Sequence, residues 1–198
     1  MADPTQALAQ RIEFIKAIDG LKNVQRKTYL FSGQRYENSA EHSWAVSTFA
    51  LTLADYAPPK TDINKVIHML LLHDIVEVDA GDSLCYDDEA NATKADREQA
   101  AAQRLFSILP DSQARHFRQL WDEFEAEEST EAQFAAALDR MIPMLHNLHT
   151  HGRAWLENHV TLQQVLDKNQ HKISRANPTL WNYLEPQLLK AKSLGWLA

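Results

Sequence analysis

The run Ile67-His68-Met69-Leu70-Leu71-Leu72-His73-Asp74 decides how this chain is interpreted. A helix that starts near Thr61 or Asp62 has an apolar face that includes Leu70 and Leu71, and that face continues three and four residues beyond Leu70. Those positions carry His73 and Asp74, whose side chains should therefore point inward. Because a buried carboxylate protonates, pairs or binds a cation, an inward imidazole beside it predicts half of a metal site.

His42 is a third polar side chain that we expect to point toward the core. It lies about one turn into another predicted helix, on the same face as residues 45, 46, 49 and 53. A helix N-terminus disfavours the imidazolium, so we expect the neutral ring that a metal requires. Taken alone, a histidine in a first turn is more often a packed or solvated side chain than a ligand.

Asp139 is the fourth candidate ligand, and it lies in the most apolar stretch of its predicted helix, residues 134–145. Pro143 cannot donate a hydrogen bond to the carbonyl of Asp139, so the helix should bend or open there. Alone, Asp139 and Arg140 would be interpreted as a solvated edge. Two histidines and two aspartates from three helices make a donor set for Zn, Mn, Co, Fe or Mg, and ligand type does not choose among them.

Composition limits the other functions that this chain could have. Its 198 residues can bury a sizeable core, and the absence of a linker-like segment favours one domain. The single cysteine, Cys85, excludes an intrachain disulfide and suits a reducing compartment. No signal peptide or membrane-spanning run is expected, and a net charge of −7 argues against nucleic acid as a partner. We expect a cytoplasmic protein that acts on a small molecule.

Abundant Ala, Leu, Gln and Glu, scarce Gly and no sustained period-two alternation predict an all-α fold. The predicted helices run from Asp3 to about Asp19, from Asn38 or Ser39 to Pro58, from Thr61 or Asp62 through His73-Asp74, from about Asp88 to Leu109, from Asp111 to about Glu125, and from Thr130 to about Thr150. Residues 20–36 are predicted to be a loop. Two weaker helices, split by Asn177-Pro178, are predicted between Trp155 and Trp196.

The four polar residues and their surroundings resemble the H…HD…D signature of the HD-domain phosphohydrolase superfamily, and its 5′-deoxynucleotidase-type branch in particular. The resemblance covers about residues 10–150 and is carried by five short segments: Leu21–Arg26, Ser39–Ser43, His73–Glu77, Gly81-Asp82 and Ala137–Asp139. It implies a single HD-domain helical bundle over residues 1–198, with a core at about 10–150 and a C-terminal helical extension at 151–198.

The resemblance also implies roles for individual residues. It places one divalent metal ion on four ligands: His42, His73, Asp74 and Asp139. Glu77 and Asp82 fall on the acidic residues of the motif, and we expect them to be catalytic. A carboxylate can orient water or accept its proton, a role that we assign to Glu77, and Asp82 would face the sugar or the leaving oxygen of the substrate. Without the motif, both residues would be interpreted as part of a solvated acidic loop.

Arg26 aligns with the family's phosphate-orienting arginine, and a guanidinium suits phosphate geometry. Arg35 is the competing choice because it lies nearer His42 in the sequence. Lys27, also expected to bind substrate, stands where the family's nucleotidase member has a tryptophan, which weakens any selectivity for 2′-deoxyribose. Lys94 and Glu98 are spaced for a helical ion pair, which is more often a surface feature than part of a site.

These features predict a metal-dependent phosphomonoesterase that acts on a nucleoside 5′-monophosphate or a similar small phosphate ester. Hydrolysis of the guanosine alarmone is the alternative enzyme activity, but Val78 follows Glu77 where those relatives carry an aspartate. A catalytically silent ligand-binding module is the non-enzyme alternative, and retention of all the motif residues argues against it. A homodimer is expected from family habit and from an apolar surface that carries tryptophan.

Overall fold

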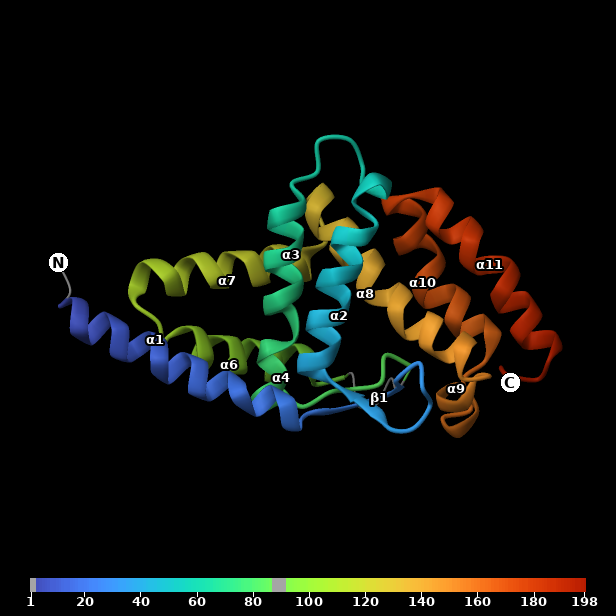
Figure 1. Ribbon diagram of the computed structural model, residues 1–198, viewed down its shortest axis with the longest axis horizontal. Coiled ribbons are helices and arrows are strands. Elements are labelled where there is room, and N and C mark those ends of the chain that lie inside the picture. Colours follow the sequence, from blue (N-terminus) through green and yellow to red (C-terminus); the bar gives the residue numbers. More distant parts are fainter. Residues whose placement is uncertain (1–2, 87–91) are drawn as a thin grey trace.

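The computed structural model describes residues 3–86 and 92–198, and helices dominate them, as predicted (Figure 1). The helices are α1 (Pro4–Ile18), α2 (Ser39–Thr52), α3 (Ile63–Leu72), α4 (Glu77–Ala80), α6 (Lys94–Phe106), α7 (Asp111–Ala126), α8 (Thr130–His149), α9 (Arg153–Glu157), α10 (Leu162–Ala176) and α11 (Pro178–Ser193). Three 3₁₀ turns and two strands join them: η1 (Asp19–Asn23), η2 (Ala54–Tyr56), η3 (His73–Val76), β1 (Gln25–Tyr29) and β2 (Tyr36–Asn38).

The first three long helices begin at the capping residues that the sequence indicates. Asp3 accepts a hydrogen bond from the backbone of α1, and Asp62 accepts two from the backbone of α3. Asn38 and Glu41 form a reciprocal capping box at the start of α2. Local side-chain chemistry therefore fixes the start of the two helices, α2 and α3, that lead to the candidate ligands.

The loop predicted over residues 20–36 was wrong, because this segment contains most of η1, all of β1 and the first residue of β2. The strands pair antiparallel and are too short for period-two alternation to be visible in the sequence. Distant contacts hold them: the rings of Tyr29 and Tyr36 stack at 4.2 Å, and both hydroxyls donate to Glu157 of α9.

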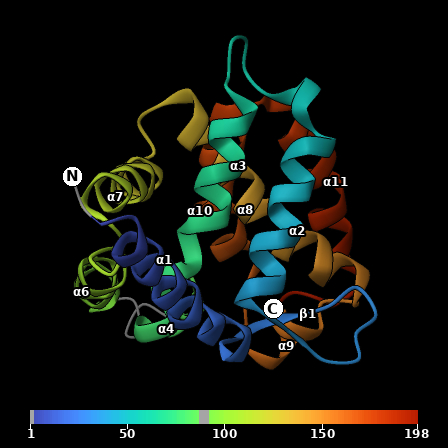
Figure 2. The same cartoon turned by 60° about the vertical axis from the view of Figure 1, so that its left-hand side comes forward.

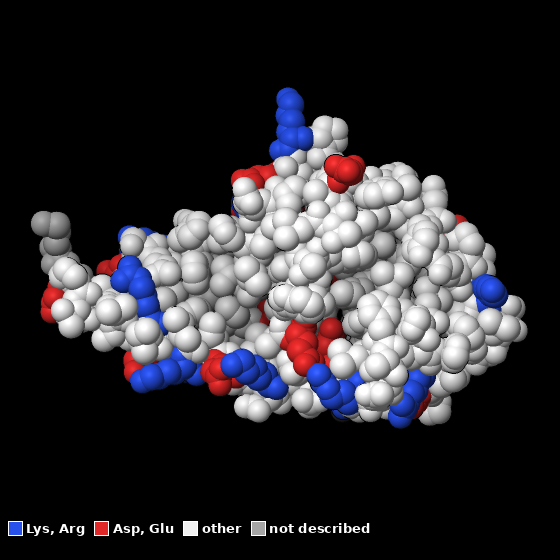
Figure 3. Space-filling view, in the orientation of Figure 1, with Lys and Arg blue, Asp and Glu red and all other residues white. Residues whose placement is uncertain are grey.

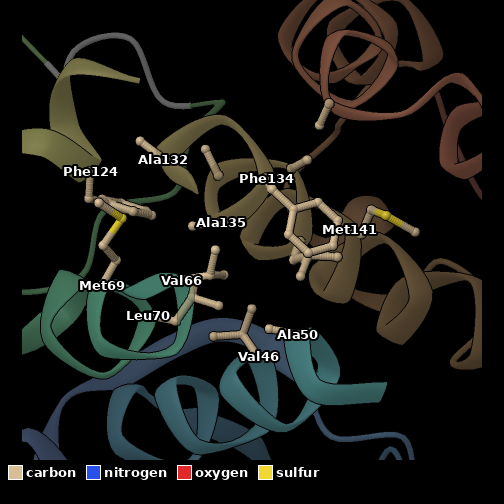
Figure 4. Close-up of a cluster of buried hydrophobic side chains, with 14 of the residues drawn as sticks. Val46, Ala50, Val66, Met69, Leu70, Phe124, Ala132, Phe134, Ala135 and Met141 are labelled. Atoms are coloured by element: carbon tan, nitrogen blue, oxygen red, sulfur yellow. The ribbon is translucent and has the colours of Figure 1, made fainter. Parts of the chain in front are cut away.

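The centre of the molecule is a layer of apolar side chains between α2, α3 and α8 (Figure 4). Val46 on α2 and Leu70 on α3 are fully buried there. Ala132 and Ala135 on α8 are equally buried, and their small size lets the helices approach closely. Because removing a buried leucine side chain costs about 2–5 kcal/mol, Leu70 anchors the end of α3 firmly against this layer.

His73 and Asp74 lie in η3 rather than inside α3, which ends at Leu72. The chain tightens into a 3₁₀ turn at this point, a common way for an α-helix to end. The prediction that both side chains are buried is nevertheless confirmed, since they are 5% and 8% exposed. The end of α3 therefore delivers this pair into the interior beside α8.

The C-terminal helices pack against α8 rather than standing apart from the rest of the chain. α10 contacts both α8 and α11, and the two predicted helices do meet at Asn177-Pro178 (Figure 2). Gly152 makes this packing possible, because its φ is +73° and a Cβ there would lie 2.2 Å from the carbonyl oxygen of Trp196. The start predicted for the helix at Asp88 lies outside the described residues, and that helix ends at Phe106.

Charged side chains are unevenly distributed over the face of the molecule that Figure 3 shows. Figure 3 shows acidic and basic groups gathered along the edge formed by α1, α4 and the hairpin, whereas the surface over α2, α8 and α11 is largely uncharged. Among the helices of the described residues, none has the length and apolar character needed to cross a bilayer.

Candidate metal centre and substrate cavity

Three of the four predicted ligands meet at one point in the interior. His42 from α2, His73 from η3 and Asp139 from α8 each offer a ligand atom, and these atoms lie within 4.8 Å of one another. His42 Nε2 is 2.8 Å and His73 Nε2 is 3.5 Å from Asp139 Oδ1. Imidazole nitrogens and a carboxylate oxygen converging in this way could hold a divalent metal ion.

The hydrogen bonding of His73 fits such an ion. Its Nδ1 lies 2.7 Å from the carbonyl oxygen of Leu70, which can only accept, so the proton is on Nδ1. Nε2 is buried without a hydrogen-bond partner among the described residues, and in the neutral ring it carries the lone pair that a metal ion would take. A metal ligand oriented by a backbone carbonyl has this arrangement. Burial lowers the pKa of His73, but the carboxylates of Asp74 and Asp139 outweigh it and raise that pKa, so an ion would displace a proton from this ring.

Asp74, the fourth predicted ligand, divides its carboxylate between two neighbours. Its Oδ1 lies 3.2 Å from His73 Nε2, while its Oδ2 accepts a 2.7 Å hydrogen bond from Arg26. It does not belong to the group of three whose ligand atoms converge. Asp74 therefore touches the candidate metal centre, and its coordination of the ion stays a prediction.

Glu37 is a member of the site that the sequence did not indicate. Its side chain is 1% exposed, and its Oε2 lies 3.3 Å from His42 Nδ1 and 3.6 Å from Arg26 Nε. The carboxylate thus sits between a candidate metal ligand and the candidate phosphate-binding arginine. Nothing in the sequence singles out Glu37, because it occupies a three-residue strand whose burial depends on distant segments.

The prediction that His42 is neutral was wrong for the chain without metal. Burial and the Arg26 charge lower the pKa of His42, but the carboxylates of Asp139 and Glu37 outweigh them and raise it to about 9. The effect of the helix N-terminus is small beside that of adjacent carboxylates. A metal ion must therefore displace a proton from this ring before it binds.

Glu77 and Asp82 line a cavity beside the three converging ligands. Glu77 begins α4 and is 4% exposed, and its Oε2 accepts a 2.5 Å hydrogen bond from the Ser39 hydroxyl. Burial and the Asp74 charge raise the pKa of Glu77 to about 8, and burial also raises the pKa of Asp82. A cation placed among these carboxylates would favour their charged forms.

The cations predicted to bind substrate, Arg26 and Lys27, line the same cavity. Burial disfavours the charge of Arg26, but Asp74 and Glu77 overcome this and hold its pKa above the usual range. Arg35, the competing choice, forms a two-point ion pair with Glu41 and does not line this cavity.

Lys94 and Glu98 were wrongly expected to be a surface pair. Glu98 is 7% exposed, and Lys94 lines the cavity while its ammonium lies 3.4 Å from the Glu98 carboxylate. The spacing of the two residues correctly indicates an ion pair, but it carries no information about which face of α6 the molecule buries.

The rest of the cavity wall comes partly from the C-terminal segment, to which the sequence assigned no role, and the lining residues of that segment are uncharged. Five residues of α8 line the cavity: Asp139, Arg140, Pro143, Met144 and Asn147. Residues that follow α8 complete this side: Ala154, Trp155, Val160 and Asn169. These are ordinary interior residue types, so no motif could have marked them as part of a site.

Comparisons with known proteins identify relatives over most of the chain. The family model of the HD domain matches residues 18–181. The 5′-deoxynucleotidase HDDC2 of Homo sapiens is 26% identical over 130 residues, which are 65% of this chain and 62% of that protein. The chain thus matches less than two thirds of the length of this relative.

Solved structures show the same fold. A crystal structure described as a predicted metal-dependent phosphohydrolase from Magnetospirillum magnetotacticum MS-1 is 44% identical, with a TM-score of 0.91 over 98% of this chain and 99% of the other. A protein from Pyrococcus horikoshii OT3 is 26% identical, with a TM-score of 0.62 over 92% of this chain and 99% of the other.

Proposed function

Since the chain belongs to the HD domain family, we propose that it is a metal-dependent phosphohydrolase that releases phosphate from a nucleoside 5′-monophosphate or a similar small phosphate ester. The observation that carries the proposal is the Nε2 atom of His73, which is buried without a hydrogen-bond partner among the described residues and faces Asp139 beside a cavity lined by Glu77 and Arg26. The names of the human and Magnetospirillum relatives support the same activity.

The metal would be held by His42, His73 and Asp139, with Asp74 as the fourth ligand. When bound, a divalent ion such as Mn, Co, Mg, Zn or Fe stabilises charge on phosphate oxygens and makes water more acidic. The donor set contains nitrogen and oxygen only, which is compatible with each of these ions.

The surrounding side chains would divide the remaining work. The Arg26 guanidinium, fixed by Asp74 at 2.7 Å, would hold a phosphate oxygen and orient the ester in the cavity. Glu77 would take the proton of the attacking water, and the Ser39 hydroxyl at 2.5 Å would keep its carboxylate in place. Asp82 would face the leaving oxygen, while Lys27 would contribute a second positive charge at the cavity.

Association into a cytoplasmic homodimer forms part of the same proposal. Trp44 and Leu51 lie seven residues apart on α2, share a face and are 68% and 60% exposed. Apolar exposure of this size on one helix favours burial against another protein surface. Light scattering coupled to size-exclusion chromatography should give the mass of two chains, and a Trp44→Glu, Leu51→Glu variant should give the mass of one.

The direct test is phosphate release from a panel of nucleoside 5′-monophosphates and sugar phosphates by metal-depleted protein, before and after a divalent metal is added. We expect release only with metal, and none from an Asp74→Ala variant. Asp79→Ala is the matched control, because Asp79 pairs with Arg104 at the surface and does not line the cavity.

Two outcomes of this test would contradict the proposal. If no metal releases phosphate from any compound, the chain is a binding module rather than an enzyme. If Asp74→Ala is as active as Asp79→Ala, the activity belongs to another site.

A further inference from the structure

The cavity extends along α8, so residues of this helix indicate how long the cavity is. Asp139 and Asn147 both line it, and they lie eight residues apart on this helix. At about 1.5 Å per residue, their backbones are about 12 Å apart along the helix axis. Asp139 marks the end at the metal ligands, so a phosphate held there by Arg26 leaves the end near Asn147 for the organic part of the ester.

The wall at the Asn147 end is uncharged. Arg140 is the last charged residue on α8 along this path, and Met144, Trp155 and Val160 follow it. Trp155 is 2% and Val160 is 1% exposed, so both are fixed by the packing around them. A rigid wall that contains an indole ring and aliphatic side chains suits a flat, neutral ring better than a second anionic group.

Asn169 supplies a polar atom in this otherwise apolar wall. It is 3% exposed, and its Nδ2 donates to the carbonyl of Val165 at 2.7 Å and contacts the Tyr86 hydroxyl at 3.4 Å. Its amide oxygen accepts no hydrogen bond from the described residues. This oxygen is therefore the acceptor in the wall with which a ligand N–H could pair.

Asn147, the other amide of this wall, has no such role, because both of its polar atoms already bind protein. Its Nδ2 donates to the Pro143 carbonyl at 3.0 Å, and its oxygen accepts the backbone N–H of Trp155 at 3.2 Å. Asn147 thus holds α9 in place, while Asn169 on α10 keeps an acceptor for a ligand.

We propose that the segment from Trp155 to Asn169 forms the subsite for the nucleobase of the substrate, in which the base packs against Trp155 and Val160 and donates an N–H to the Asn169 amide oxygen. This inference rests on the proposed function and assigns the C-terminal helices a part in recognition. Every common nucleobase carries an N–H donor and a flat ring, so the subsite would separate nucleotides from sugar phosphates more sharply than one base from another.

The test compares the four common nucleoside 5′-monophosphates with ribose 5-phosphate, which lacks the base. Binding is measured by calorimetry with the Glu77→Gln variant, and with the same variant that also carries Asn169→Ala. Hydrolysis is measured with the parent protein and with the Asn169→Ala variant, in both of which Glu77 is intact. For the nucleotide that the parent protein prefers, we expect Asn169→Ala to lower both the binding affinity and kcat/KM about tenfold. The affinity and kcat/KM for ribose 5-phosphate should not change.

Asn158→Ala is the matched control, because Asn158 makes the same side-chain hydrogen bond to the carbonyl four residues earlier but does not line the cavity. Thermal melting reports whether each variant folds. Asn169→Leu, which has a similar volume and suits an apolar wall, replaces Asn169→Ala if the latter unfolds.

The outcomes separate this inference from the proposed function. The proposed subsite is contradicted if nucleotides bind no better than ribose 5-phosphate, or if they bind equally well to the Asn169 and Asn158 variants. This holds whichever compounds the protein hydrolyses. Binding that depends on Asn169 without any phosphate release supports the subsite and contradicts the proposed activity.

Discussion

The two ends of the cavity are built in opposite ways. The end at His42, His73 and Asp139 collects charged groups from segments far apart in the sequence, and carboxylates there shift the pKa of their neighbours. The end at Trp155 and Asn169 is neutral and combines one stretch of chain after α8 with Met144 and Asn147 of α8 itself. The difference suggests that chemistry and recognition are separate, so that variants at the two ends should change different measured quantities.

The largest effect should follow from removing a candidate ligand at the charged end. His73→Ala deletes the free nitrogen that faces Asp139, so we expect stoichiometric metal content to be lost and phosphate release to fall to background. Elemental analysis of the purified variant measures the metal. His68→Ala is the control, because His68 is exposed on α3, the helix that precedes His73, and retention of metal by both variants would show that the ion binds elsewhere.

Glu77→Gln should separate metal binding from catalysis at this end. The amide has nearly the same shape as the carboxylate but cannot accept a proton, so we expect bound metal to be kept and kcat to fall about 10²- to 10⁴-fold for every substrate. Steady-state kinetics beside elemental analysis gives both values. Full activity in this variant would remove Glu77 from the mechanism.

Glu37→Gln should have a smaller effect, because Glu37 acts through its neighbours. Loss of its charge weakens the contacts with His42 at 3.3 Å and Arg26 at 3.6 Å, and we expect metal affinity to fall about 10- to 100-fold. Metal titration by calorimetry measures the change. Glu41→Gln, which alters the surface pair with Arg35, is the control, and equal affinities in the two variants would contradict the role of Glu37.

The smallest predicted effect is a dependence of metal affinity on pH. The pKa of His42 is about 9 without metal, so the ring is protonated at neutral pH and must lose that proton when the ion binds. Below this pKa, each unit of rising pH should increase the apparent affinity about tenfold until the pKa is reached. Titrations at pH 6.5 and 7.5 test this, and equal affinities would mean that His42 is already neutral.

The same contrast explains what the sequence could and could not predict. His73 and Asp74 were visible because they interrupt an apolar helix face, and Asn38 and Asp62 were visible as caps. Residues whose position depends on distant packing carried no such signal. Glu37 is buried only because the hairpin folds onto other elements, and Asn169 reaches the cavity only because α10 packs on α8.

The protonation state of His42 could not be predicted from the sequence either. The position of His42 near a helix start predicted a neutral ring, but the carboxylates that raise its pKa come from β2 and α8. The fold class could therefore be predicted from composition and local pattern, and the candidate metal ligands from pattern together with the family resemblance. The electrostatics of the centre and the shape of the neutral end required the structure.

The most direct measurement is a crystal structure of the Glu77→Gln variant with Mn²⁺ and a nucleoside 5′-monophosphate. We expect an anomalous peak bonded to His42 Nε2, His73 Nε2 and Asp139, the phosphate against Arg26, and the base beside Trp155 and Asn169. A Mn²⁺ ion bound away from these ligands, or a nucleotide outside the cavity, would contradict the account.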